Sequence, residues 1–172
     1  PKSKVLIIAG SDSSGGAGIQ ADIKTVTALG SYALTAITAV TAQDTKIVKN
    51  IMSVSLKNFK EQLTMNINDI GANAVKIGML HNTKLIKCVC KIIKKYKLKN
   101  IVLDPVMVAK GGAKLVDNNS IKHLKKLLFP LCNLVTPNIP EAEVLTGYSI
   151  KNKQDMIKAA KKILNMGSKN VL

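Results

Sequence analysis

The sequence predicts an α/β protein built around a mostly parallel sheet. Short apolar runs of strand length alternate with longer stretches in which apolar residues recur at helical spacing. Glycine, proline or polar residues separate these stretches, and no internal repeat or low-complexity segment interrupts them. Strands that alternate with helices of this length form β-α-β units with parallel strands. Because 172 residues are the size of one ordinary domain, we expect a single domain over residues 1–172.

Apolar and β-branched runs predict the strands. The first covers residues 4–9 and ends at Gly10, and the long uncharged run that follows Tyr32 ends near Gln43. The full set of expected strands is 4–9, 32–40, 47–54, 74–77, 101–103 and 134–135, with one more beginning at 170–172.

Apolar stripes at helical spacing predict the helices. Ile19, Ile23 and Val26 form the first stripe, which Gly30 ends. Pro140 suits the first turn of a short helix that ends at Gly147. The other expected helices cover residues 56–70, 85–96, 121–128 and 156–167. Ser53 or Ser55 is expected to start the helix at 56–70, and the polar residues 117–120 are expected to start the helix at 121–128.

Residues of unusual chemistry follow five of the predicted strands. In open sheets of this class, ligands bind beyond the carboxyl ends of the strands, so these residues are expected to share one site. They are residues 10–12, 43–44, 78–79, 104–105 and 136–138. A glycine-rich loop at residues 15–18 also lets the backbone approach a ligand and offers N–H groups at a helix start. The alternative for this loop is an ordinary tight turn between strand and helix.

Several single residues have both a functional and a structural interpretation. Asp22 lies on the apolar face of its helix, either facing a site or at an edge that reaches water. The amide of Gln43 can donate and accept at the edge of a heterocycle, or cap a strand end. Asn138 and Glu141 can serve an anion or metal site, but spacing alone favours a helix cap. Asp104 either assists a metal or caps a turn, and residues 110–112 form either a phosphate-contacting loop or a plain turn.

The net charge of +16 comes entirely from lysine, because the sequence contains no arginine. Lysines recur opposite the apolar stripes of the predicted helices, which favours a solvated surface over nucleic-acid binding. No apolar run approaches the ~20 residues of a membrane-spanning helix, and no signal peptide opens the chain. Three cysteines are too few for a disulfide framework. We therefore expect a cytoplasmic protein that binds neither nucleic acid nor membrane.

Six motifs occur in order along the whole chain: IAGSD (8–12), GGAGIQAD (15–22), TAVTAQ (38–43), KIGML (76–80), VLDPVM (102–107) and TPNIPE (136–141). Together they resemble the hydroxymethylpyrimidine/phosphomethylpyrimidine kinases of thiamine biosynthesis, which belong to the ribokinase-like superfamily. The resemblance implies a three-layer ribokinase-like domain. It also implies a kinase that transfers the γ-phosphoryl group of ATP, with Mg²⁺, to 4-amino-5-hydroxymethyl-2-methylpyrimidine and then to its monophosphate.

The resemblance also implies roles for individual residues. Gln43 is expected to form hydrogen bonds with the ring nitrogen and the amino group of the pyrimidine. Asn138 and Glu141 match the family's metal and phosphate motif, so they are expected to hold Mg²⁺ directly or through water, with Asp104 near the phosphates. A homodimer is expected for the full-length protein. The residues expected to line the pyrimidine pocket are Gly10, Asp22, Gln43, Met79 and Val106.

The sequence stops where family members continue. They add a glycine-rich turn that forms an anion hole and carries the candidate catalytic base, so we expect these groups beyond Leu172. On this expectation the chain is the N-terminal two thirds of the kinase domain, with a sheet incomplete at its C-terminus, and is a poor catalyst by itself. Two other functions stay open, a pyridoxine/pyridoxal kinase and a non-catalytic ligand-binding fragment.

Overall fold

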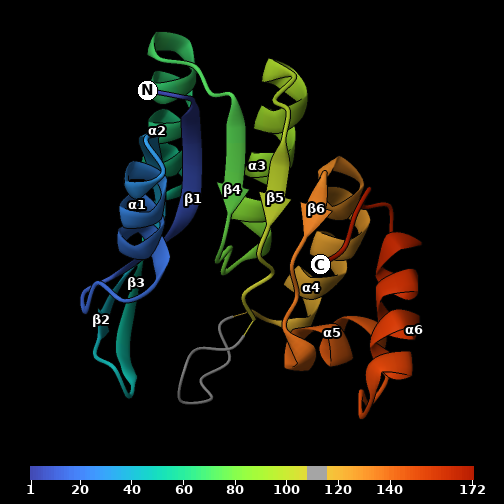
Figure 1. The fold of residues 1–172 in the computed structure, drawn as a ribbon. Helices are drawn as coiled ribbons and strands as arrows, with labels where there is room; N and C mark the ends of the chain where they lie inside the picture. The colour runs from blue at the N-terminus through green and yellow to red at the C-terminus, as the bar shows by residue number, and fades with distance from the viewer. Residues whose placement is uncertain (108–115) are drawn as a thin grey trace.

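The computed structural model describes residues 1–107 and 116–172. Its centre is a six-stranded sheet with the order β3-β2-β1-β4-β5-β6 (Figure 1). All neighbouring strands pair in parallel except β2 and β3, which form an antiparallel hairpin at one edge. The α/β class and the mostly parallel sheet predicted from the sequence are therefore confirmed. The strands are β1 (Lys4–Asp12), β2 (Tyr32–Gln43), β3 (Val48–Ser53), β4 (Ala74–Ile77), β5 (Ile101–Leu103) and β6 (Leu134–Val135).

Polar side chains begin most of the helices, and two of them, Ser55 and Asp117, were expected from the sequence. Ser55, Asn82, Asp117 and Asn152 each accept a hydrogen bond from a backbone N–H three residues further on. Such caps satisfy donors that have no partner inside the helix. The helices are α1 (Gly18–Ala28), α2 (Leu56–Asp69), α3 (Thr83–Tyr96), α4 (Asn118–His123), α5 (Ile139–Thr146) and α6 (Lys153–Leu164).

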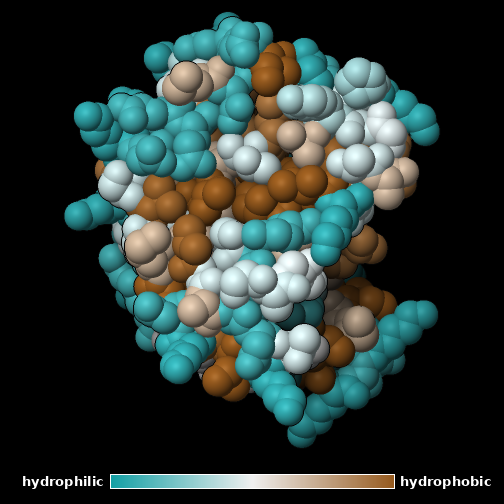
Figure 2. Space-filling model, turned by 90° about the vertical axis from the view of Figure 1, so that its left-hand side faces the viewer, coloured by the Kyte–Doolittle hydropathy of each residue, from teal (hydrophilic) through white to brown (hydrophobic). Residues whose placement is uncertain are grey.

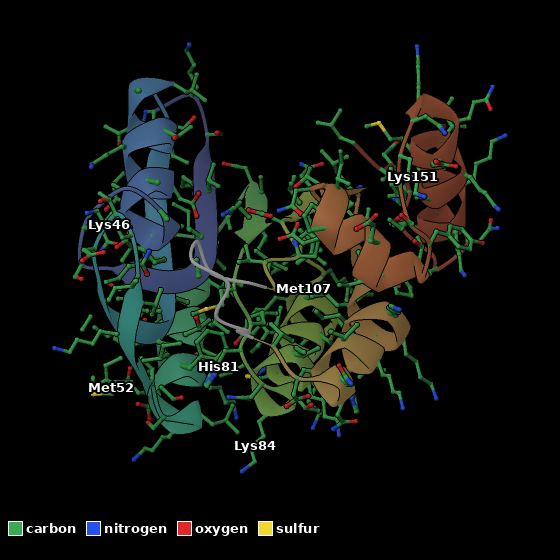
Figure 3. The ribbon with its side chains drawn as sticks, turned by 90° about the horizontal axis from the view of Figure 1, so that it is seen from below. Lys46, Met52, His81, Lys84, Met107 and Lys151 are labelled. Atoms are coloured by element: carbon green, nitrogen blue, oxygen red, sulfur yellow. The ribbon has the colours of Figure 1, made fainter. Side chains whose placement is uncertain are left out.

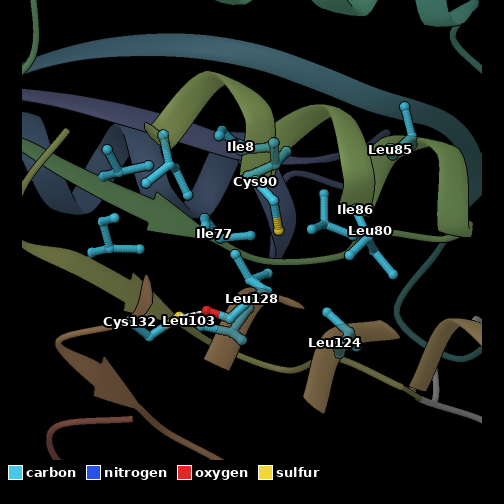
Figure 4. Packing of buried hydrophobic residues seen from close by; sticks show 14 of the residues in the cluster. Ile8, Ile77, Leu80, Leu85, Ile86, Cys90, Leu103, Leu124, Leu128 and Cys132 are labelled. Atoms are coloured by element: carbon cyan, nitrogen blue, oxygen red, sulfur yellow. Dashed lines mark hydrogen bonds between the residues drawn. The ribbon is translucent and has the colours of Figure 1, made fainter. Parts of the chain in front are cut away.

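The main core lies between the sheet and helices α2, α3 and α4 (Figure 4). Ile8 and Ile77 project from the sheet into this layer, which also contains Leu85 and Ile86 of α3. Helix α1 covers the opposite face of β1 and β2, where Ile19 packs against β1. Two helical layers thus sandwich the sheet and leave the carboxyl ends of its strands at one end of the molecule.

Two segments differ from the sequence-based expectation. The helix predicted after the start signal at residues 117–120 begins there, at Asn118, but it continues as a π-helical segment (Leu124–Leu128) and a 3₁₀ turn (Phe129–Leu131). Pro130 lacks a backbone N–H, so an α-helical hydrogen-bond pattern cannot extend through this residue. The strand expected at residues 170–172 amounts to one parallel bridge between Val135 and Val171.

None of the helices in the described residues is long and apolar enough to cross a bilayer. The longest described helices, α2 and α3, have 14 residues each. A spanning helix needs about 20 residues that are mostly apolar.

Candidate functional site

A pocket of about 440 Å³ opens at the carboxyl ends of β1, β2, β4 and β5. Figure 3 views this end of the molecule from below, with Lys46 of the β2–β3 turn on one side and Lys151 on the other. The pocket lies where the parallel topology predicts a ligand site, because these strands end side by side. The predicted site residues that line it are Gly10, Asp22, Gln43, Met79, Asp104 and Val106.

Gly10 and Met79 shape one wall of the pocket together. A Cβ atom added to Gly10 would lie 2.6 Å from Cε of Met79, far inside normal contact distance. Glycine at this position therefore lets the methionine side chain lie against the end of β1. The hydroxyl of Thr38 donates to the carbonyl oxygen of Met79 at 2.9 Å and fixes its backbone.

Gln43 ends β2 and presents its amide at the pocket. Its backbone exchanges two hydrogen bonds of 2.8 Å with the hydroxyl of Ser13, which ties β2 to the loop after β1. Oε1 of the amide lies 3.1 Å from Oγ1 of Thr41. Among the described residues, Nε2 of Gln43 has no hydrogen-bond partner, so this nitrogen is available to a ligand.

The carboxylate of Asp12 binds N–H groups of the glycine-rich loop that precedes α1. Its carboxylate accepts hydrogen bonds from the backbone N–H groups of Ser14, Gly16 and Ala17, at 2.8–3.1 Å. The prediction that the glycine-rich loop offers free N–H groups is therefore wrong for Gly16 and Ala17. Glycine is still required nearby, because Gly18 has φ +54 and a Cβ there would lie 2.2 Å from the carbonyl oxygen of Gly10.

The carboxyl group of Asp12 is buried and ionised. Burial acts to raise its pKa, but the hydrogen bonds from Ser14, Ala17 and Gly16 outweigh burial and lower the pKa below the usual value of 3.8. A carboxylate that accepts several N–H groups in this way is stabilised in its charged form. Asp12 thus serves as an internal anion that organises the loop.

Three charged side chains meet across the pocket floor. Nζ of Lys76 on β4 lies 2.7 Å from Oδ2 of Asp22 on α1. The same nitrogen lies 4.0 Å from Oδ2 of Asp104, which follows β5. The ion pair accounts for a carboxylate on the inner face of α1, a position that the sequence left open between a site and an edge.

Asn138 and Glu141 lie at the start of α5 and do not line the pocket. The side chain of Asn138 accepts the N–H of Glu141 at 2.9 Å, and Oε2 of Glu141 accepts the N–H of Asn138 at 3.0 Å. This reciprocal pair is a capping box, the structural interpretation that spacing alone favoured. Asn138 is exposed, whereas Glu141 is 5% exposed.

Two acidic groups link the pocket to the start of α5. Burial raises the pKa of Asp104; Lys76 opposes this effect and Asp22 adds to it. Burial also raises the pKa of Glu141; the hydrogen bond from the Asn138 backbone opposes it and the charge of Asp104 adds to it. The charge of Asp104 thus acts on the carboxyl group of Glu141, and a cation near both groups would offset this effect.

The described residues contain no cluster of three or more histidine, cysteine or acidic side chains that could hold a metal ion. This does not conflict with a magnesium site, because Mg²⁺ is commonly held by one or two carboxylates together with water and substrate phosphates. Asp104 and Glu141 fit that requirement.

Sequence reasoning missed the roles of Asp12 and Lys76. The sequence marks both residues as unusual, because Lys76 interrupts an apolar strand and Asp12 comes just before the glycine-rich loop. It does not identify their hydrogen-bond partners. The loop expected at residues 110–112 lies outside the described residues.

The family model described as phosphomethylpyrimidine kinase matches residues 12–172. The chain belongs to this family. A hydroxymethylpyrimidine/phosphomethylpyrimidine kinase of Bacillus subtilis is 46% identical to this family member over 169 residues, which cover 98% of the chain and 62% of that relative. The chain therefore spans about three fifths of the length of that curated relative.

Solved structures agree with the assignment of this chain to the phosphomethylpyrimidine kinase family. A crystal structure of a phosphomethylpyrimidine kinase from Clostridium difficile superposes with a TM-score of 0.91 at 47% identity, covering 98% of this chain and 73% of that one. An ADP complex of Bacillus subtilis pyridoxal kinase superposes with a TM-score of 0.90 at 41% identity, covering 98% and 64%. The ribokinase-like fold expected from the sequence is thus confirmed.

Proposed function

We propose that the protein containing this chain phosphorylates 4-amino-5-hydroxymethyl-2-methylpyrimidine and its monophosphate with ATP, in thiamine biosynthesis. The main observation behind the proposal is the pocket of about 440 Å³ at the strand ends, which is lined by Gln43, whose amide nitrogen has no hydrogen-bond partner in the part of the chain that the structure describes. Family membership supports the same assignment. The relative that crystallised with ADP supports nucleotide binding by this scaffold.

In this proposal, the amide of Gln43 forms hydrogen bonds with the polar edge of the pyrimidine, while Met79 and Val106 contact the ring faces. An amide side chain suits the task, because a ring nitrogen accepts from Nε2 and an exocyclic amino group donates to Oε1. The hydroxyl oxygen of the bound alcohol forms a bond to the γ-phosphorus of ATP as the bond from that phosphorus to ADP breaks, and the hydroxyl proton is released. The chain's contribution is positioning and charge, which dominate phosphoryl transfer.

Glu141 and Asp104 are the residues that would hold Mg²⁺, in part through water. The burial of Glu141 and the effect of the charge of Asp104 on its pKa support this proposal. The ion, when bound, neutralises phosphate charge. Because the oxygen atoms of Asn138 and Glu141 already serve the capping box, water-mediated contacts preserve the structure at the start of α5.

Replacing Glu141 by Gln in the protein that contains this chain should raise the Mg²⁺ concentration needed for half-maximal rate. The affinity for the pyrimidine should stay unchanged, because Glu141 lies outside the pocket. Glutamine retains an oxygen for the capping box, so the helix start is preserved. The rate as a function of Mg²⁺ concentration provides the measurement, with the exposed Glu61→Gln as control. An unaltered Mg²⁺ dependence would mean that Glu141 is only a helix cap.

The direct experiment on the proposed function compares two acceptors. The protein is incubated with ATP and Mg²⁺ and either the hydroxymethylpyrimidine or pyridoxal, and phosphorylated product is measured by mass spectrometry. We expect preferential turnover of the pyrimidine. Preferential turnover of pyridoxal would support the second function, which the similarity to a pyridoxal kinase structure favours. Saturable pyrimidine binding without any transfer would support a ligand-binding module.

We also propose that the protein forms a homodimer through the β2–β3 hairpin. Strand β3 is an edge of the sheet and carries the exposed side chain of Met52, while Tyr32 and Val40 are exposed on β2. Figure 2 shows a band of hydrophobic surface on this side of the molecule. An unpaired edge with apolar side chains is a site of association.

Sedimentation velocity tests the homodimer. Met52→Lys should shift the protein from dimer toward monomer, because a charged side chain on an edge strand opposes pairing. Met65→Lys, on the exposed side of α2, is the matched control. A dimer that persists unchanged in Met52→Lys would place the interface elsewhere.

Location in the cytoplasm, without membrane or nucleic-acid partners, remains part of the proposal.

A further inference from the structure

Lys76 is a charged residue in the interior of the sheet. It lies on β4 between Val75 and Ile77, whose side chains enter the main core. Its neighbours in register are Ile7 on β1 and Val102 on β5. Because side chains alternate along a strand, Lys76 projects from the face that α1 covers. A lysine in such a place is costly unless its ammonium group reaches a partner or water.

The ammonium group of Lys76 reaches the pocket and finds carboxylates there. Nζ bonds to Asp22 at 2.7 Å and lies 4.0 Å from Asp104. Gly78 makes room for this arrangement, since a Cβ at that position would lie 3.2 Å from Nζ. Lys76 is the one basic side chain among the described residues that line the pocket.

The ion pair uses only one oxygen of Asp22. Oδ2 accepts the hydrogen bond from Lys76, whereas Oδ1 has no hydrogen-bond partner within the part of the chain that the structure describes. The Asp22 side chain is 20% exposed and lines the pocket. Oδ1 is therefore the atom left to accept a hydrogen bond from a ligand.

We propose that Lys76 is a positioning residue of the acceptor pocket: by holding Oδ2 of Asp22 and balancing the charges of Asp22 and Asp104, it presents Oδ1 of Asp22 to a donor group of the bound pyrimidine. This inference rests on the proposed function. Lys76 acts through Asp22. Without the ammonium group, the Asp22 carboxylate loses its anchor and lies near Asp104 with no cation between them.

Calorimetric titration with 4-amino-5-hydroxymethyl-2-methylpyrimidine tests the proposal. Lys76→Met should weaken binding about 10-fold, as expected for losing one charge-assisted hydrogen bond. Lys76→Arg should restore affinity to within about 3-fold of the unaltered protein, because the guanidinium still bonds a carboxylate. Lys84→Met, on the exposed start of α3, removes the same charge outside the pocket and should bind normally.

A double-mutant cycle separates positioning from independent effects. If Lys76 acts through Asp22, the double variant Lys76→Met/Asp22→Asn should bind no more weakly than the worse of the two single variants. If the fold-losses of pyrimidine affinity in the two single variants multiply in the double variant, the proposal is wrong. Normal binding by Lys76→Met would also overturn it. Thermal melting is measured for each protein, and Lys76→Gln replaces Lys76→Met if the latter does not fold.

The titration also distinguishes a failure of the proposed function from a failure of the Lys76 proposal. If the unaltered protein does not bind the pyrimidine, the proposed function fails and the Lys76 proposal fails with it. If the unaltered protein binds the pyrimidine and Lys76→Met binds it equally well, only the Lys76 proposal fails. If Lys76 has only a structural role, Lys76→Met should lower the melting temperature, and its loss of pyrimidine affinity should not depend on Asp22.

Discussion

Replacing Gln43 by Ala should weaken pyrimidine binding about 30-fold, equivalent to about 2 kcal/mol for polar ligand groups left without partners. The expectation follows from the position of the amide at the end of β2 and from its nitrogen, which has no partner among residues 1–107 and 116–172. ATP affinity should change little, because the amide is assigned to the pyrimidine. Calorimetric titrations with each ligand measure both affinities.

The matched control for Gln43→Ala is Gln154→Ala on the exposed side of α6. It removes the same amide far from the pocket and should leave both affinities unchanged. Pyrimidine affinity that survives in Gln43→Ala would show that another group reads the ring. The backbone hydrogen bonds between Gln43 and Ser13 do not depend on the side chain, so the loop should keep its conformation.

Replacing Asp12 by Ala should destabilise the protein by about 3 kcal/mol, since hydrogen bonds to a charged group are worth about 1.5–3 kcal/mol. The substitution leaves the N–H groups of Ser14, Gly16 and Ala17 without their acceptor. Asp12 is 4% exposed, so water replaces the lost carboxylate poorly. Urea denaturation measures the change in the free energy of unfolding. Asp44→Ala is the control, because Asp44 makes similar bonds in a fully exposed turn and should cost less.

The same carboxyl group makes stability depend on acid pH. The folded pKa of Asp12 lies below its usual value of 3.8, so its stabilising contribution is complete above that pH. The contribution is lost as the pH falls through the folded pKa. Asp12→Ala should therefore flatten the acid limb of a stability–pH curve below about pH 4. An acid limb identical to that of the unaltered protein would contradict the assigned low pKa.

Much of the fold could be predicted because its signals are local. Apolar runs of strand length and apolar stripes at helical spacing, with start residues such as Ser55 and Asp117, marked most elements. The π-helical segment from Leu124 to Leu128 could not be predicted in this way, because it depends on how the chain approaches Pro130 and packs on α3. The single bridge at Val171 likewise depends on pairing with a distant residue, Val135.

The candidate site was predictable to the extent that topology places strand ends together. Gln43 and Asp104 were expected at one site because both follow strands of a parallel sheet, and both line the pocket. The partner of Asp22 could not be predicted, because Lys76 is 54 residues away in sequence. The role of Asp12 was missed for a different reason. Its acceptor bonds require the folded loop geometry, which the glycine count alone does not specify.

The most direct test of the account is a crystal structure of the protein with 4-amino-5-hydroxymethyl-2-methylpyrimidine at saturating concentration. We expect the pyrimidine ring to lie in the pocket between Met79 and Val106, with the Gln43 amide at hydrogen-bond distance from the polar edge of the ring. The pyrimidine bound elsewhere, for example in the apolar groove between α5 and α6, with this pocket empty would contradict it.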